Sequence, residues 1–207
     1  MTAIVEYGVG NLFSLQCSLA ALGLAATVTG DVAVLESAER VILPGVGAFG
    51  DAMEKLRQTG LAQPLRRLAG QGKPLLGICL GMQLLFDESR EFGTHAGLGL
   101  VAGKVLPLED ALRAGGYNYK VPHMGWNCLE KVHGRSPLLK YTGDDDYFYY
   151  VHSFYATGCE EALVAQSEYG VMVPGVVQNK NVFGTQFHPE KSGDVGLAML
   201  KAFAEVT

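Results

Sequence analysis

The chain has 207 residues, of which 48% are hydrophobic and 18% are charged. This composition excludes a disordered chain, which combines low hydrophobicity with high net charge. The formal net charge is −5, and no basic stripe typical of nucleic-acid binders is visible. The length fits one large domain or two small ones.

Two further observations limit the class of protein. No apolar run approaches the roughly 20 residues of a membrane helix, and the chain opens into a strand-like segment rather than a leader, so we expect a cytoplasmic protein with no membrane or nucleic-acid partner. The cysteines Cys17, Cys79, Cys128 and Cys159 are far apart and form no C-x-x-C pair. We therefore expect free thiols and no metal site.

The first half of the chain alternates between apolar strands and helices. Asn11 is a candidate N-cap and Gly23 a stop for the first helix. Strands apolar on both faces that alternate with helices predict a parallel sheet covered on each side. The expected strands are residues 3–6, 25–29, 40–43 and 73–78, and the expected helices are 12–22, 50–58 and 61–69.

The second half changes character. From about Leu100 to Val182 we expect short strands and dense turns, with a strand at 147–151. Another strand is expected at 182–187 and a final helix at 195–206. The sequence therefore predicts one α/β domain over residues 1–207, with a mostly parallel sheet flanked by helices and a mixed or antiparallel extension.

The segment Gly77-Ile78-Cys79-Leu80-Gly81 is the most informative. It has the form Gly-x-nucleophile-x-Gly between an apolar strand and a helical run over 82–86, which is the context of a nucleophile elbow. A cysteine at a helix N-terminus is favoured as thiolate. The alternative is a buried core cysteine, and the flanking glycines favour the functional interpretation over it.

A thiolate nucleophile needs a base and a group that orients the base. Of the five histidines, His188 is the best candidate, because it follows an apolar strand and opens His188-Pro189-Glu190. Residues two apart in an extended segment point to the same side, so Glu190 can hold the imidazole tautomer. Taken alone, the tripeptide also fits a surface turn.

The site also needs donors for a developing oxyanion. The N–H of Leu80 is one, and the loop Leu43-Pro44-Gly45-Val46-Gly47 ends another strand on the same side of a parallel sheet. A plain strand-to-helix turn explains that loop equally well. Dinucleotide binding is rejected, because Gly8-Val9-Gly10-Asn11 lacks the third glycine of the fingerprint; we expect no cofactor.

With these residues in view, the chain resembles the class I (triad) glutamine amidotransferases, which have a flavodoxin-like fold. Cys79 within GICLGMQLLF, and His188 with Glu190 within GTQFHPEKS, carry the resemblance, which covers the whole chain. The segments PGVGAFG, KVPHMGWN, YVHSFY and HPEKS are similar to one subgroup, the glutaminase subunits of imidazole glycerol phosphate synthases.

The resemblance implies that glutamine is hydrolysed to glutamate and ammonia. It implies that Cys79 attacks the side-chain carbonyl, His188 relays protons, Glu190 orients it, and Val46, Gly47 and Leu80 form the oxyanion hole. It also implies that glutamine is held by residues around the nucleophile, with Glu91 on its ammonium group and backbone of the 152–154 segment on its carboxylate; this set is Gly45, Gln83, Glu91, His152, Ser153 and Phe154. Without the resemblance, Glu91 reads as an exposed charge.

The resemblance further implies a partner. Ammonia would pass to a cyclase subunit that forms imidazole glycerol phosphate and an aminoimidazole carboxamide ribonucleotide in histidine biosynthesis, and the isolated subunit would be nearly idle. Rotation of a peptide in the PGVG loop would be one switch. The positions implied near the interface and ammonia passage are Asn11, Lys120, His123, Trp126, Tyr149 and Lys191.

Three other functions remain open from the sequence. One is a glutaminase of the same class that serves anthranilate, guanylate or pyridoxal phosphate synthesis, which the KVPHMGW and HPEKS segments argue against. Another is a stand-alone cysteine hydrolase such as a γ-glutamyl hydrolase, which would be fully active without a partner. The third is a non-catalytic scaffold, which an intact Cys79, His188 and Glu190 argue against.

Overall fold

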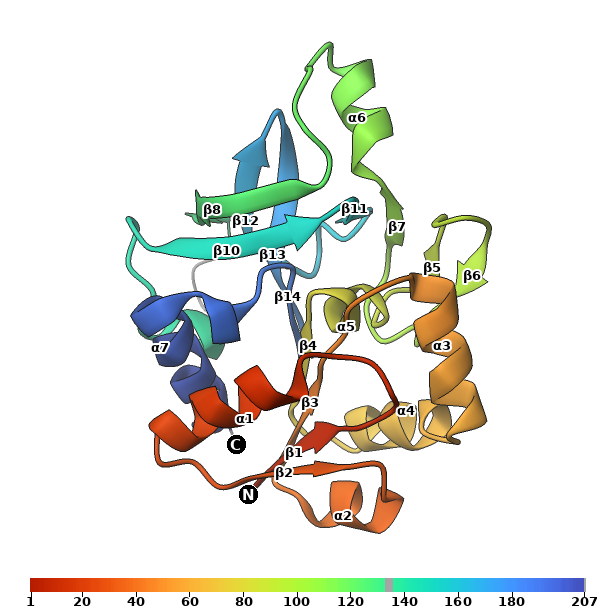
Figure 1. Cartoon of the computed structure of the whole chain (residues 1–207), viewed down its shortest axis with the longest axis vertical. Coiled ribbons are helices and arrows are strands. Elements are labelled where there is room, and N and C mark those ends of the chain that lie inside the picture. The colour runs from red at the N-terminus through yellow and green to blue at the C-terminus, as the bar shows by residue number, and fades with distance from the viewer. Residues whose placement is uncertain (133–135, 207) are drawn as a thin grey trace.

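The computed structural model describes residues 1–132 and 136–206, and its centre is a sheet in which parallel and antiparallel strands occupy separate halves (Figure 1). Strands β2, β1, β3, β4 and β14 pair in parallel, and β13, β12 and β9 continue the sheet in antiparallel pairing. In spatial order the strands are β2 (Ala26–Thr29), β1 (Thr2–Val5), β3 (Arg40–Leu43), β4 (Leu75–Ile78), β14 (Val182–Thr185), β13 (Val171–Asn179), β12 (Leu163–Tyr169) and β9 (Glu130–Lys131).

Two smaller sheets lie beyond one end of the parallel strands (Figure 1). One is an antiparallel ribbon of β8 (His123–Cys128) and β10 (Tyr147–His152). The other contains β11 (Phe154–Thr157), β7 (Lys104–Pro107), β5 (Glu88–Ser89) and β6 (His95–Ala96). The mixed or antiparallel extension predicted from the sequence is therefore confirmed.

Helices cover both faces of the parallel strands because those strands are apolar on both sides. Ile4 packs with α1 and α7 in one core cluster, whereas its neighbours Ala3 and Val5 pack with α2, α3 and α4 in another. Figure 1 shows α1 and α7 on one side of the sheet and α3 and α4 on the other. The helices are α1 (Leu12–Ala21), α2 (Val32–Ser37), α3 (Phe49–Gln58), α4 (Ala62–Gly70), α5 (Leu80–Gln83), α6 (Leu108–Ala114) and α7 (Gly193–Ala204).

Most predicted elements are confirmed with small shifts at their ends. The side chain of Asn11 caps α1 by accepting from the Ser14 N–H at 3.4 Å, and Gly23 follows with φ +70°. The helix expected over 82–86 is instead the single turn α5. Helices α2 and α6 were not predicted, and β12 and β13 are longer than the short strands expected for this half.

The parallel strands place four loops at one edge of the sheet. The loops that follow β1, β3, β4 and β14 all leave from the carboxyl ends of their strands. Open α/β sheets bind ligands at this edge. Among the described residues, no helix is both long and apolar enough to cross a membrane.

Candidate active site

Cys79 occupies a sharp turn between β4 and α5. Its backbone has φ +54° and ψ −111°, which is unusual for a residue other than glycine. The flanking glycines are required by packing: a Cβ on Gly77 would lie 2.6 Å from the Gly81 carbonyl oxygen, and one on Gly81 would collide with the Leu43 carbonyl. The turn thus has the geometry of a nucleophile elbow, although α5 offers only one turn of helix behind the sulfur.

His188 lies against the elbow and is held by Glu190. Its Nδ1 is 2.8 Å from Oε1 of Glu190, and both side chains are almost fully buried. Burial alone lowers the pKa of His188, but its hydrogen bonds to Cys79 and Glu190 outweigh that effect and raise the pKa to about 10. Glu190 thus orients the imidazole, and an imidazolium is favoured beside Cys79.

Neighbouring histidines do not compete for this role. Both nitrogens of His152 are engaged, Nδ1 with the Phe154 carbonyl at 2.8 Å and Nε2 with His123 at 3.0 Å. Burial lowers the pKa of His152 to about 3 and that of His123 to about 4. His133 lies outside the described residues.

The loop after β3 lies directly against the elbow. A Cβ on Gly45 would lie 2.6 Å from the Gly81 nitrogen and 2.9 Å from the Leu80 Cβ, so only glycine allows this approach. Val46 and Gly47 line the same cavity as Cys79 and Leu80, and Gly47 has φ +94°. Within the described residues, no hydrogen bond uses the N–H of Val46, Gly47 or Leu80. These N–H groups are therefore available as donors.

An open cavity of about 690 Å³ extends from the sulfur. It is large enough for an amino acid and is lined by His188, Gln83, Glu91 and the 152–154 segment. Glu91 is buried and accepts a hydrogen bond of 2.6 Å from the Phe49 N–H, which corrects the view of it as an exposed charge. Burial raises the pKa of Glu91, and the Phe49 hydrogen bond opposes that effect.

Hydrogen-bonded amides build another part of the site. Gln83 donates from Nε2 to the Phe154 carbonyl and to Oε1 of Gln186, both at 3.0 Å. Gln186 was not singled out in the sequence, yet its Nε2 lies 3.9 Å from the Cys79 sulfur. Its position two residues before His188 was the available signal, because alternate residues of an extended segment share a side.

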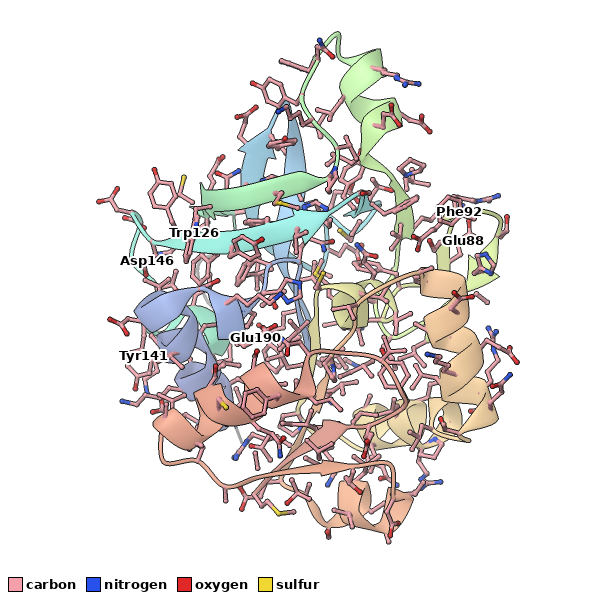
Figure 2. The ribbon with its side chains drawn as sticks, viewed as in Figure 1. Glu88, Phe92, Trp126, Tyr141, Asp146 and Glu190 are labelled. Atoms are coloured by element: carbon pink, nitrogen blue, oxygen red, sulfur yellow. The ribbon has the colours of Figure 1, made fainter. Side chains whose placement is uncertain are left out.

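Sequence reasoning also missed Phe92. It lines the cavity beside Glu91, is 88% exposed, and has φ +51°. Its ring meets Phe154 edge-on at 6.1 Å. Figure 2 shows Phe92 near Glu88 and away from Glu190, whose side chain is buried. No sequence pattern indicated this placement.

The positions expected near a partner interface fall into two groups. Trp126 and Lys120 are exposed, and Trp126 packs edge-on against half-buried Tyr149 across the β8–β10 ribbon with ring centroids 6.0 Å apart (Figure 2). Lys191 is exposed and lines the cavity. His123 is buried, so it cannot contact a partner from the surface.

Asn11 is half-buried, and its cap bond to Ser14 fixes its side chain beside the triad. It borders a small cavity together with His188 and Glu190. Nowhere in residues 1–132 and 136–206 do three metal-ligating side chains gather to hold a metal ion.

Comparison with known proteins agrees with this geometry. The family model described as glutamine amidotransferase class-I matches residues 3–206. The imidazole glycerol phosphate synthase subunit HisH of Bacillus licheniformis is 51% identical over 208 residues, covering 100% of this chain and 97% of that protein. The protein of the same name from Wolinella succinogenes is 48% identical, with both chains fully covered.

Solved structures show the same fold at low identity. The structure of PurLQS from Thermotoga maritima includes a chain with a TM-score of 0.74 and 20% identity, covering 98% of this chain and 96% of that one. This likeness concerns the fold alone.

Proposed function

Since this chain belongs to the class-I glutamine amidotransferase family, we propose that it is the glutamine-hydrolysing subunit of an imidazole glycerol phosphate synthase. One observation carries the chemistry: Cys79, at a strained strand–helix turn, meets a buried His188 that Glu190 holds at 2.8 Å. The curated relatives of about 50% identity over the whole chain support the synthase.

The reaction follows from the triad. The Cys79 thiolate attacks the side-chain carbonyl of glutamine, and the C–N bond breaks as His188 gives its proton to the leaving ammonia. This leaves a γ-glutamyl thioester on the sulfur. His188 then takes a proton from water, which attacks the thioester and releases glutamate and the thiolate. Glu190 keeps Nε2 of His188 directed at the sulfur throughout.

The unpaired N–H groups supply the oxyanion hole. The Leu80 N–H follows the nucleophile directly, and Val46 or Gly47 supplies a second donor from the loop after β3. The close contact of Gly45 with Leu80 and Gly81 keeps the loop after β3 against the turn that holds Cys79. A rotation of the exposed Val46–Gly47 peptide is a simple way to turn this donor on or off.

Glutamine is held at its α-carbon, where its ammonium and carboxylate groups lie close together. The buried Glu91 carboxylate pairs with the α-ammonium group, and the backbone of Ser153 and Phe154 faces the α-carboxylate. Gln83 lines the same cavity, with its amide orientation fixed by Phe154 and Gln186. An amino acid carries both charges close together, which a site with a carboxylate and backbone donors matches.

The ammonia is used by a cyclase subunit, in the cytoplasm. Free ammonia is protonated in water near neutral pH, so a closed passage has to deliver the neutral nucleophile. The exposed Trp126 and Lys120, half-buried Tyr149 and the cavity-lining Lys191 form the surface proposed for docking, with Asn11 beside the triad and His123 inside the passage. The complex then forms imidazole glycerol phosphate and the aminoimidazole carboxamide ribonucleotide.

The test is a glutaminase assay of the purified chain alone, and then with a cognate cyclase subunit and its nucleotide ligand. We expect negligible hydrolysis alone and an increase of orders of magnitude in the complex. Full activity of the chain alone, on glutamine or on γ-glutamyl peptides, would identify a stand-alone hydrolase. Activation only by the synthase subunit of another amidotransferase would assign the chain to that enzyme.

A further inference from the structure

Two buried histidines face each other across the β8–β10 ribbon. His123 and His152 are direct cross-strand neighbours, and Nδ1 of His123 lies 3.0 Å from Nε2 of His152. Both rings are almost fully buried. Neither has a role in the acid–base chemistry of Cys79, because His188 already holds that position.

The hydrogen-bond partners determine where the protons are. Nδ1 of His152 lies 2.8 Å from the Phe154 carbonyl oxygen, which can only accept, so this nitrogen carries the proton. Burial lowers the pKa of both histidines, so each ring is neutral and carries one proton. Nε2 of His152 is therefore an acceptor, and Nδ1–H of His123 must be the donor.

The hydrogen bonds continue from the Phe154 carbonyl oxygen to side chains near the nucleophile. The same carbonyl accepts a second hydrogen bond, from Nε2 of Gln83 at 3.0 Å. Gln83 also donates to Gln186, whose own amide nitrogen lies 3.9 Å from the Cys79 sulfur. The two histidines thus join β8 to the wall of the cavity next to the nucleophile.

Two aromatic rings restrict the orientation of His123, the residue at which this series of hydrogen bonds begins. His123 is stacked on Tyr150 at 4.7 Å and on Tyr169 at 4.0 Å, with interplanar angles of 19° and 23°. A ring held between two others has little freedom to rotate its donor away. The direction of the Nδ1–H bond is therefore set by packing in the ribbon.

We propose that His123 is a positioning residue for glutamine: its Nδ1–H holds His152 in the tautomer that fixes the Phe154 carbonyl, and with it the backbone of the substrate site. The inference rests on the proposed function, because the 152–154 backbone and Gln83 are the groups assigned to hold glutamine. It adds a residue that touches neither substrate nor nucleophile. The effect should appear in substrate binding rather than in the chemical step.

The hydrogen bond itself can be observed without any activity. In the full chain labelled with ¹⁵N-histidine, a scalar coupling across the N–H···N bond should connect Nδ1 of His123 to Nε2 of His152 at neutral pH. His152 should show a protonated Nδ1 and an unprotonated Nε2. Absence of the coupling, or a proton on Nε2 of His152, would overturn the proposal even if every variant failed to fold.

Kinetics in the complex with the cyclase subunit test the functional part. His123→Phe keeps a flat ring but removes the donor, and we expect KM for glutamine to rise about tenfold with kcat within about twofold. His123→Asn, whose amide N–H can occupy the Nδ1 position, should restore most of the loss. Tyr141→Phe, which removes a hydroxyl at the exposed ion pair of Lys140 with Glu205, is the control and should match the wild type.

The outcomes separate this inference from the proposed function. An unchanged KM in His123→Phe, in an enzyme whose wild type hydrolyses glutamine, would overturn the positioning role. A lower kcat at unchanged KM would overturn it too, since that pattern places His123 in the chemical step. A wild type that hydrolyses no glutamine would overturn the proposed function, and the coupling would then decide whether the His123–His152 bond exists.

Discussion

The carboxylate of Glu91 accepts a 2.6 Å hydrogen bond from the backbone N–H of Phe49, the first residue of α3. This contact joins the loop after β5 to the helix that follows the Val46–Gly47 loop, and Glu91, Val46 and Gly47 line the same cavity. It fixes one carboxylate oxygen and directs the side chain into the cavity. A single residue thereby connects the proposed ammonium site with the proposed oxyanion loop.

Replacing Glu91 tests the ammonium site. Glu91→Gln keeps the shape and an acceptor for Phe49 but removes the charge, so we expect KM for glutamine to rise by about 10- to 100-fold with little loss of stability. The control is Glu88→Gln, three residues earlier, where the carboxylate pairs with Lys104 and Arg90 at the surface. Equal kinetics for the two variants would remove Glu91 from the site.

The Glu190–His188 contact predicts a large catalytic effect. Glu190→Gln can present an amide N–H toward the protonated Nδ1 of His188, so the imidazole loses its orientation, and we expect kcat to fall about 1,000-fold or more. Glu205→Gln makes the same change at an exposed ion pair with Lys140 and should be neutral. A fall in kcat of less than about tenfold for Glu190→Gln would contradict the orienting role.

Close packing between two loops gives a third prediction. Gly45→Ala forces a Cβ to within 2.6 Å of the Gly81 nitrogen, so the oxyanion loop must move away from the elbow. We expect a loss of about 1–3 kcal/mol in unfolding free energy and a clear drop in kcat. Gly70→Ala, at the end of α4 with open space at its Cβ, should leave both unchanged. Urea unfolding compares the stabilities of the two variants, and glutaminase assays compare their kcat values.

Because His123 and His152 are buried, we expect the folded chain to lose stability in acid. His123 and His152 stay neutral in the folded chain down to pKa values of about 4 and about 3, whereas unfolded histidine binds a proton near 6.5. The unfolded state therefore binds more protons as pH falls below 6.5, and each histidine lowers the unfolding free energy by about 1.4 kcal/mol per pH unit. His188, with its raised pKa, is protonated in both states over this range.

Urea unfolding at pH 7, 6 and 5 checks this expectation. Stability should fall steeply from pH 6 to pH 5 in the wild type, and about half as steeply in His123→Phe, which removes one of the two titrating rings. The same slope in both proteins would show that His123 is protonated in the folded state.

The sequence predicted the parallel half of the fold well because its strands are short, apolar on both faces and bounded by glycine or proline. Residues 40–43 were predicted and found as β3 without any shift. The six-residue helix α2 was missed because the β-branched start of Val32–Ser37 gives no helical period, although Asp31 caps it. Helix α6 was missed for a related reason, since Leu108–Ala114 lies in a region dominated by turn residues.

The site was predictable where one local motif specifies the geometry, and less so elsewhere. Gly77, Cys79 and Gly81 specify their own turn, because only glycines fit beside the backbone of Leu43 and Gly81. The burial of Glu91 depends on Phe49, which is 42 residues away, and no local pattern predicts it. The hydrogen bond between His123 and His152 likewise requires the pairing of β8 with β10.

The most direct measurement for the proposed function is to trap the covalent intermediate. The complex with the cyclase subunit and its nucleotide ligand is mixed with glutamine, quenched in acid, and analysed by mass spectrometry of the intact chain and of its peptides. We expect a γ-glutamyl adduct on the peptide that contains Cys79, and none in Cys79→Ala. Rapid glutamine hydrolysis without this adduct, or hydrolysis that survives Cys79→Ala, would contradict the proposed role of Cys79.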